Sequence, residues 1–148
     1  MSEWINQGEA IDRISISDRG FQYGDGLFET IAVRDGKPRL WRYHIDRLAR
    51  GCEVLGIEMP SESALSDGVN QALRNSETPT SHAGVKVIVS AGSGRRGYER
   101  AFADSPTVQF PAFSSVPLAT GIHGSGIDTV ICRTRAASGA ASVGWTSL

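Results

Sequence analysis

Residues 27–41 read "LFETIAVRDGKPRLW", and this stretch carries the strongest fold signal in the chain. Along residues 27–33 two sets of side chains alternate, as they do on the two faces of a β-strand. Asp35 and Gly36 follow, and an Asp-Gly pair between strand-like runs is the strongest short hairpin signal in a sequence. The stretch therefore predicts two antiparallel strands.

Two helices are predicted after this hairpin. Ile45, Leu48, Cys52 and Leu55 recur at spacings of three, four and three, which places them on one helical face. This helix is expected to start near Tyr43 and to stop at Gly56. A second helix is expected from about Ser61, whose hydroxyl can cap it, to about Asn75.

The remaining segments predict short strands and loops. Pro111 limits its strand to a sheet edge or a bend. Helices and strands do not alternate strictly, so we expect an α+β fold with the helices on one face of a mainly antiparallel sheet. The strand candidates are a pair around a turn at residues 7–8, "GVKVIVS" at 84–90, "TVQFPAF" at 107–113 and "IDTVICRT" at 127–134.

Composition limits the classes of partner. The 148 residues include 15 basic and 16 acidic side chains, with a net charge of −1 and no Lys/Arg run typical of nucleic-acid binding. No apolar run is long enough for a membrane span, and Cys52 and Cys132 lie far apart in sequence. The three histidines lack metal-site spacing, so no metal site is predicted. We expect a cytoplasmic protein that binds neither nucleic acid nor membrane.

Two glycine-rich segments are the candidate sites: "RGFQYGDGLFET" at 19–30 and "AGSGRRGYER" at 91–100. Glycines at these spacings indicate tight turns or close approach of the backbone to another group. Arg95 and Arg96 could hold a carboxylate or a phosphate, and a solvated surface turn is the alternative. Asp18 and Asp25 are expected to fix turns by accepting bonds from the backbone.

Arg47 is the remaining candidate for binding an anion. In a helix that starts near Tyr43, Arg47 would lie in the first turn, where unpaired amides and the helix dipole favour an anion. An ion pair with Asp46 or Glu53 is the alternative for this side chain. His44 is expected to make a contact near the helix start rather than to take part in catalysis.

Four segments in this order resemble the N-terminal half of the class IV, or fold type IV, pyridoxal-phosphate enzymes: "SDRGFQYGDGLFET", "VRDGKPRLW", "HIDRL" and "VKVIVSAGSGRRGY". Within that class, the "GSGRRGY" loop is most similar to that of the 4-amino-4-deoxychorismate lyases. The resemblance implies that residues 1–135 form the small domain of a two-domain homodimer, with the active site in the cleft beside a larger cofactor domain.

The resemblance also implies roles for five residues. Arg47, the arginine of "HIDRL", would contact the phosphate of pyridoxal 5'-phosphate. Tyr23 and Phe28 would lie beside the substrate, a small molecule, while Arg96 and Tyr98 would belong to the loop that meets its polar groups.

The reaction implied is release of pyruvate from aminodeoxychorismate to leave 4-aminobenzoate, a folate precursor. In the family a lysine beyond the position of residue 135 holds the cofactor as a Schiff base. Residues 136–148 read "AASGAASVGWTSL" without such a lysine, and Lys37 and Lys86 are the two lysines of the chain. We therefore expect an aberrant tail at 136–148, a missing cofactor domain and no catalytic lysine. The alternatives are a class IV aminotransferase, for branched-chain or D-amino acids, and a non-catalytic fragment or interaction module.

Overall fold

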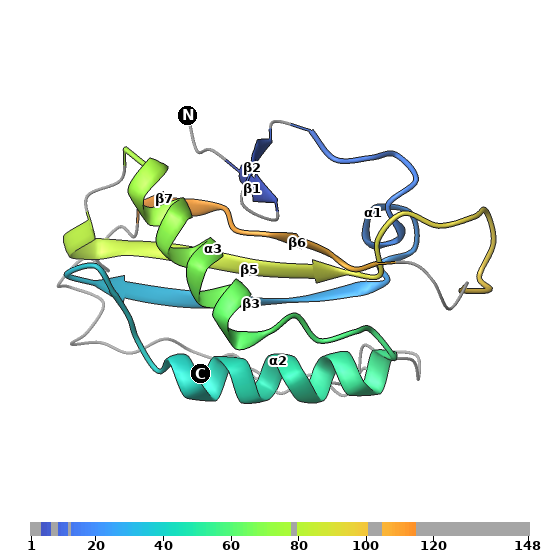
Figure 1. Ribbon diagram of the computed structural model, residues 1–148, viewed down its shortest axis with the longest axis horizontal. Helices are drawn as coiled ribbons and strands as arrows, with labels where there is room; N and C mark the ends of the chain where they lie inside the picture. Colours follow the sequence, from blue (N-terminus) through green and yellow to red (C-terminus); the bar gives the residue numbers. More distant parts are fainter. Residues whose placement is uncertain (1–3, 7–8, 12, 78–79, 101–104, 115–148) are drawn as a thin grey trace, which may run out of the picture. The chain divides into compact units, whose positions relative to one another are not determined.

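The structure, a computed structural model, describes residues 4–6, 9–11, 13–77, 80–100 and 105–114. All of its elements belong to one compact unit, Met1–Ser115. Figure 1 shows the long helices beside the strands of a sheet. The elements in chain order are β1 (Trp4–Asn6), β2 (Glu9–Ile11), α1 (Arg19–Tyr23), β3 (Gly26–Arg34), β4 (Lys37–Pro38), α2 (Trp41–Leu55), α3 (Glu62–Asn75), the 3-10 helix η1 (Thr80–His82), β5 (Ala83–Ser90), β6 (Thr107–Gln109) and β7 (Ala112–Ser114).

The sheet is antiparallel in every described pair, in the order β2-β1-β6-β5-β3-β4, with β7 also paired to β5. Its longest ladder joins β3 to β5, from Gly26 opposite Ser90 to Val33 opposite Ala83. This ladder brings the start of β3 and the end of β5 to the same end of the sheet. The predicted antiparallel sheet with helices is confirmed.

The predicted hairpin at residues 27–41 is confirmed. β3 and β4 pair antiparallel, with Arg34 opposite Lys37. Asp35 and Gly36 both have positive φ, 50° and 74°, as a two-residue hairpin turn of the favoured hand requires. β4 has two residues, and α2 begins at Trp41 directly after Leu40, whose φ of 53° lies in the left-handed region.

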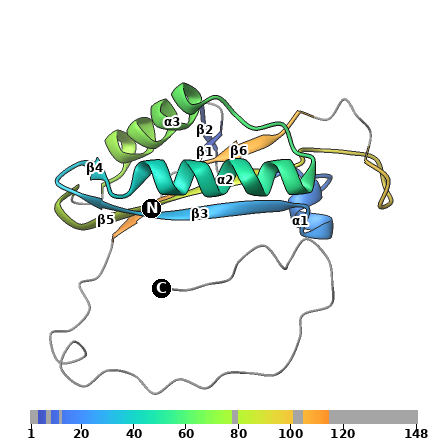
Figure 2. The same ribbon diagram turned by 90° about the horizontal axis from the view of Figure 1, so that it is seen from below.

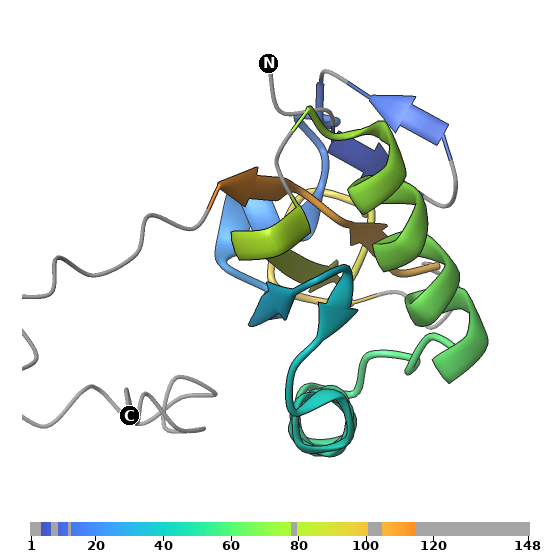
Figure 3. The ribbon, with the colours of Figure 1, turned by 90° about the vertical axis from the view of Figure 1, so that its left-hand side faces the viewer.

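Both predicted long helices are confirmed, together with their end signals. Ser61 Oγ accepts from Ala64 N at 3.2 Å and caps α3, and Gly56 closes α2 in the left-handed region. Figure 3 looks along β3 and β5 and shows α2 nearly end-on, so this helix runs along those strands.

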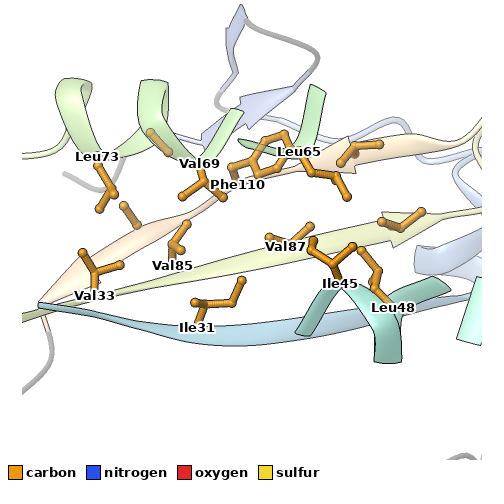
Figure 4. Packing of buried hydrophobic residues seen from close by; sticks show 14 of the residues in the cluster. Ile31, Val33, Ile45, Leu48, Leu65, Val69, Leu73, Val85, Val87 and Phe110 are labelled. Atoms are coloured by element: carbon orange, nitrogen blue, oxygen red, sulfur yellow. The ribbon is translucent and has the colours of Figure 1, made fainter. Parts of the chain in front are cut away.

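The core lies between the two long helices and one face of the sheet. Figure 4 shows side chains of α2 and α3 directed at those of β3, β5 and the segment after β6. The residues labelled there are all buried: Ile31, Val33, Ile45, Leu48, Leu65, Val69, Leu73, Val85, Val87 and Phe110. On β3 the residues between them, Phe28, Thr30 and Ala32, are exposed. The helices therefore cover one face of this strand.

Pro111 produces the predicted bend. β6 and β7 both pair with β5, with Gln109 opposite Ile88 and Ala112 opposite Val85, and Pro111 lies in the break between them. The proline has no N–H to donate, but its carbonyl accepts from Lys86 N at 2.9 Å. The two short strands thus follow the same neighbour on either side of one bend.

Two expectations need comment. The segment after Asp18 was expected to consist of turns, but the structure shows the short helix α1. The "IDTVICRT" strand at 127–134 and the aberrant tail at 136–148 lie outside the described residues. Among the described residues, no helix is long and apolar enough to cross a membrane.

Candidate active site

The two glycine-rich segments meet at one end of the sheet. Figures 1 and 2 place α1 and the loop of residues 91–100 beside the start of β3 and the end of β5. Arg19 N donates to Gly92 O at 2.8 Å, and Asp18 forms an isolated antiparallel bridge with Ser93. Segments more than seventy residues apart are therefore joined by backbone contacts.

Asp18 anchors α1 to the end of β5. Its Oδ1 accepts from Gly20 N at 2.8 Å and from Phe21 N at 3.4 Å, so the predicted side-chain bonds to the backbone are present but cap a helix instead of fixing a turn. Its Oδ2 accepts from Ser90 Oγ at 2.8 Å. A Cβ on Gly20 would lie 2.7 Å from the Ser90 Cβ, and Gly24 closes α1 with a φ of 66°. The glycines here allow close packing of the helix and a left-handed turn.

Asp25 pairs with side chains rather than with the backbone amides expected of it. Arg19 Nε donates to Asp25 Oδ2 at 2.8 Å, and Arg100 donates to the same carboxylate through Nε, at 3.2 Å, and Nη2. Burial raises the pKa of Asp25, but the hydrogen bonds from Arg19 and Arg100 outweigh burial and hold that pKa below its usual value. Asp25 is therefore ionised across the physiological range.

Arg19 also binds the backbone of the arginine-rich loop. Its Nη1 donates to Gly97 O at 3.1 Å and to Glu99 O at 3.4 Å, and its Nη2 donates to Tyr98 O at 3.2 Å. The residue is 3% exposed. Three successive carbonyls of the loop thus point at one buried guanidinium.

The structure brings the predicted residues Tyr23 and Tyr98 together. Their ring centroids lie 5.5 Å apart, and the Tyr23 hydroxyl accepts from Gly97 N at 2.9 Å. Tyr98 is 89% exposed, and Arg96 is also exposed. In the described part of the chain Arg96 makes no ion pair, so its charge is available to a ligand.

Phe28 lies on the face of β3 away from the helices and is 43% exposed. The Lys86 Nζ atom stands 4.7 Å from its ring centroid, a cation–π contact between diagonal neighbours on β3 and β5. A cavity of about 210 Å³ adjoins Phe28 and reaches the glycines of α1. Its wall includes Ile14, Phe21, Gly26, Ile88 and Gln109.

Arg47 is placed differently from the expectation. α2 starts at Trp41, so Arg47 lies in its second turn and away from the unpaired amides of the helix start. Its partner is neither Asp46, which pairs with Arg42, nor Glu53, but Glu29, to which Nε donates at 2.5 Å and Nη2 also donates. β3 supplies this carboxylate, a pairing that local helix spacing could not reveal.

Glu29 is a buried carboxylate, 3% exposed, and it also accepts from His44 Nδ1 at 2.7 Å. His44 therefore makes a contact near the start of the helix, in agreement with its expected structural role. The hydrogen bond with Glu29 raises the pKa of Arg47 above its usual value. The Arg47 side chain is still 47% exposed.

Sequence reasoning assigned no role to Arg19 and Arg100, and it did not identify the contact of Lys86 with Phe28 or the pairing of Glu29 with Arg47. Arg19 and Arg100 each lie at one end of a glycine-rich segment, but the carbonyl acceptors of Arg19 and the carboxylate partner of Arg100 lie in the other segment. Among the described residues, no group of three or more His, Cys, Asp or Glu side chains could hold a metal ion.

Comparison with known proteins supports one family. Residues 26–135 match the family described as amino-transferase class IV. The chain is 31% identical to the aminodeoxychorismate lyase of Vibrio harveyi over 132 residues, which are 89% of this chain and 47% of that protein. It is 34% identical to the Bacillus subtilis aminodeoxychorismate lyase over 96 residues, 64% of this chain and 33% of that protein. The chain therefore spans less than half the length of these relatives.

A solved structure agrees with the sequence matches. The 4-amino-4-deoxychorismate lyase of Pseudomonas aeruginosa superposes with a TM-score of 0.65 at 35% identity, covering 81% of this chain and 42% of that one. A pyridoxal-phosphate-bound hypothetical aminotransferase from Mycobacterium tuberculosis shares the fold, with a TM-score of 0.62 at 22% identity over 83% of this chain and 42% of that one. The chain thus belongs to the class IV aminotransferases, a pyridoxal-phosphate-dependent family, and resembles the N-terminal portion of aminodeoxychorismate lyase.

Proposed function

We propose that this chain supplies the substrate-facing small domain of a pyridoxal-phosphate-dependent lyase that converts 4-amino-4-deoxychorismate into 4-aminobenzoate and pyruvate. One observation carries the proposal: the Gly/Arg/Tyr loop of residues 91–100 is bound to Tyr23 at the end of the sheet where α1, the start of β3 and the end of β5 line the cavity beside Phe28. The similarity to two aminodeoxychorismate lyases and to a solved lyase structure supports it. A homodimeric, cytoplasmic enzyme is part of the same proposal.

The residues offer complementary contacts to a ring that bears carboxylates. Phe28 provides an exposed aromatic face, while the ammonium of Lys86 above it and the exposed guanidinium of Arg96 each provide a positive charge. A guanidinium binds a carboxylate through two parallel hydrogen bonds, whereas an ammonium acts as a point charge. Tyr98 is exposed on the same loop as Arg96, and Tyr23 holds this loop through its bond from Gly97 N.

Arg47 is the residue of this chain that fits pyridoxal phosphate, through the phosphate group. Glu29 occupies two nitrogens of the Arg47 guanidinium, and within the described residues the third has no hydrogen-bond partner. With its side chain nearly half exposed, Arg47 can donate from that nitrogen to one phosphate oxygen. When bound, the cofactor supplies the electron sink for the cleavage. Its other contacts, including a lysine, are proposed to come from a cofactor domain outside residues 1–135.

A chimera tests the proposed activity. Residues 1–114 would replace the matching segment of the Vibrio harveyi lyase, and cofactor absorbance would first confirm that the chimera binds pyridoxal phosphate. We expect pyruvate release from aminodeoxychorismate and little transfer of amino groups to a 2-oxo acid. A cofactor-loaded chimera with the reverse preference would favour an aminotransferase and sink the lyase assignment.

The aminotransferase alternative rests on a specific similarity. The chain is 31% identical over 107 residues to a putative branched-chain-amino-acid aminotransferase of Methanocaldococcus jannaschii, covering 72% of this chain and 36% of that protein. A non-catalytic interaction module is the third possibility. A chimera that folds but does not bind the cofactor would support this module.

The proposed role of Arg47 has its own test in the chimera. Arg47→Lys retains a positive charge beside Glu29 but removes the outward guanidinium nitrogen, and Arg50→Lys is the matched change at an exposed position one turn on. We expect the first variant to lose bound cofactor on dialysis and the second to retain it. Equal retention in the two variants would exclude Arg47 as a phosphate ligand.

A further inference from the structure

We infer that Arg19, Asp25 and Arg100 form a positioning cluster that turns the loop of residues 95–99 so that the carbonyls of residues 97–99 face inward and the side chains of Arg96 and Tyr98 face outward. These three residues are proposed as positioning residues and not as substrate ligands. They act through the loop that carries Arg96 and Tyr98. The inference rests on the proposed function only for what the loop binds, since the geometry of the loop can be tested without turnover.

The guanidinium of Arg19 is the centre of this cluster. It is almost wholly buried, and its nitrogens donate to one carboxylate and to the carbonyls of Gly97, Tyr98 and Glu99. Its Cζ also lies 4.9 Å from the Tyr23 ring centroid. A buried charge of this kind requires an ionised partner, and Asp25 provides it.

Arg100 fastens the end of the loop to a different element. Its Nη1 donates to Leu55 O at 2.5 Å and to Gly56 O at 2.8 Å, the carbonyls at the C-terminal end of α2. Its other nitrogens bind Asp25. One carboxylate therefore links α1, the loop and α2, the helix that carries Arg47.

The outward side of the loop shows the consequence. Arg95 and Arg96 are exposed and, within the described residues, form no ion pair, and Tyr98 is 89% exposed. If water took the place of Arg19 and bound these carbonyls, the loop could adopt many orientations, because water can donate to a carbonyl from any direction. Because three carbonyls converge on a planar fork of donors, a lysine ammonium cannot reproduce the arrangement.

Hydrogen exchange of the 148-residue chain tests the inference. The amide of Gly97, which donates to the Tyr23 hydroxyl, reports on the loop, and the amides of Ile31 and Val87 report on the sheet. We expect Arg19→Lys and Asp25→Asn to speed exchange at Gly97 by about tenfold or more, as for the loss of one charge-assisted hydrogen bond, with a smaller change at the sheet amides. Arg42→Lys, in an exposed ion pair, is the control and should change neither.

The rate of trypsin cleavage after Arg95 and Arg96 gives a second measurement. We expect faster cleavage in Arg19→Lys and Asp25→Asn and an unchanged rate in Arg42→Lys. Tyr23→Phe guards against misfolding, since it removes only the hydroxyl that binds Gly97 N and should speed exchange at that amide alone. Three outcomes would overturn the inference: an unprotected Gly97 amide in the original chain, exchange at Gly97 that is unchanged in Arg19→Lys, or equal acceleration at Gly97 and in the sheet. The last outcome would show a general loss of stability rather than positioning.

Discussion

At the scale of single residues, burial and pairing give each polar side chain a different chemistry. Glu29 and Asp25 are acids four residues apart, yet Glu29 is bound to Arg47 and His44 of α2. Asp25 instead links Arg19, of its own glycine-rich segment, to Arg100 of the other. Their roles follow from their neighbours and not from their residue type.

Cys52 provides a chemical test of burial. Burial raises the pKa of its thiol to about 11, so about one thiol in a thousand is ionised at pH 8. We expect iodoacetamide to leave Cys52 unmodified in the folded chain and to label it fully in guanidinium chloride, as measured by peptide mass spectrometry. Rapid labelling under native conditions would contradict the packing of α2 against the sheet.

Arg47→Ala should reduce the free energy of unfolding by about 1.5–3 kcal/mol, because it removes the guanidinium from the buried Glu29 carboxylate and leaves His44 as the side chain that still bonds to it among the described residues. Arg50→Ala, at an exposed position on the same helix, should change it by less than about 0.5 kcal/mol. Denaturant titration of the two variants measures the difference. Similar losses would mean that the bonds between Arg47 and Glu29 contribute nothing to stability.

At the scale of elements, the two long helices differ in whether the neighbour of a buried glycine could move to make room for a larger side chain. α3 brings Gly68 against the ring of Phe110, which is 2% exposed. α2 brings Gly51 against the flexible end of Leu27, which is only partly buried. The same residue type therefore faces a fixed neighbour in one helix and a movable one in the other.

Gly68→Ala and Gly51→Ala form a matched pair for this difference. A Cβ at residue 68 would lie 2.3 Å from a carbon of the Phe110 ring. We expect the cost of overpacking, about 1–3 kcal/mol, to exceed the gain in helix propensity of about 1 kcal/mol. At residue 51 the Leu27 side chain can move aside, so that variant should be neutral or more stable. Thermal unfolding of both variants and the original chain measures these changes. A Gly68→Ala variant more stable than the original chain would refute the packing of α3 against Phe110.

At the scale of the whole molecule, Asp25 connects three elements, so its ionisation should affect the stability of the fold. Its pKa is lowered in the folded state, and its stabilising contribution is therefore present above the unfolded pKa and lost as pH falls through the folded one.

We expect Asp25→Asn to have a lower free energy of unfolding than the original chain. This gap between the two free energies should be constant above about pH 5 and should narrow below about pH 4. Asp46→Asn, in the exposed pair with Arg42, should show little gap at any pH. Urea unfolding from pH 7 to pH 3 tests this. A gap for Asp25→Asn that stays constant to pH 3 would mean that the carboxylate charge is not responsible.

The two lysines allow a test of cofactor attachment to the chain by itself. Lys37 is exposed on β4, and the Lys86 amine already lies 4.7 Å from the Phe28 ring centroid, in a contact that an attached cofactor would have to displace. We expect borohydride treatment with pyridoxal phosphate to give low, scattered labelling and no pyruvate release. Stoichiometric labelling of either lysine, with turnover, would overturn the proposal that the catalytic lysine lies in a separate domain.

Much of the fold could be predicted from the sequence, because its signals are local. Asp35 and Gly36 fixed the turn, Ser61 and Gly56 marked helix ends, and Pro111 predicted a bend, each through the conformations that its own backbone allows. The helix α1 was missed because its cap also depends on Ser90, which binds the Asp18 carboxylate across 72 positions.

Only the tertiary structure decided the ionic partners of Arg47 and Arg100 and the carbonyl acceptors of Arg19. Sequence spacing suggested Asp46 or Glu53 as the ionic partner of Arg47. In the structure β3 lies beside α2 in a register that places Glu29 at Arg47 instead. Arg19 finds its carbonyl acceptors 78 to 80 positions away because β5 returns the chain beside β3. Local sequence specifies which conformations a segment adopts, whereas the choice of a buried ionic partner depends on which segments the sheet brings together and removes from water.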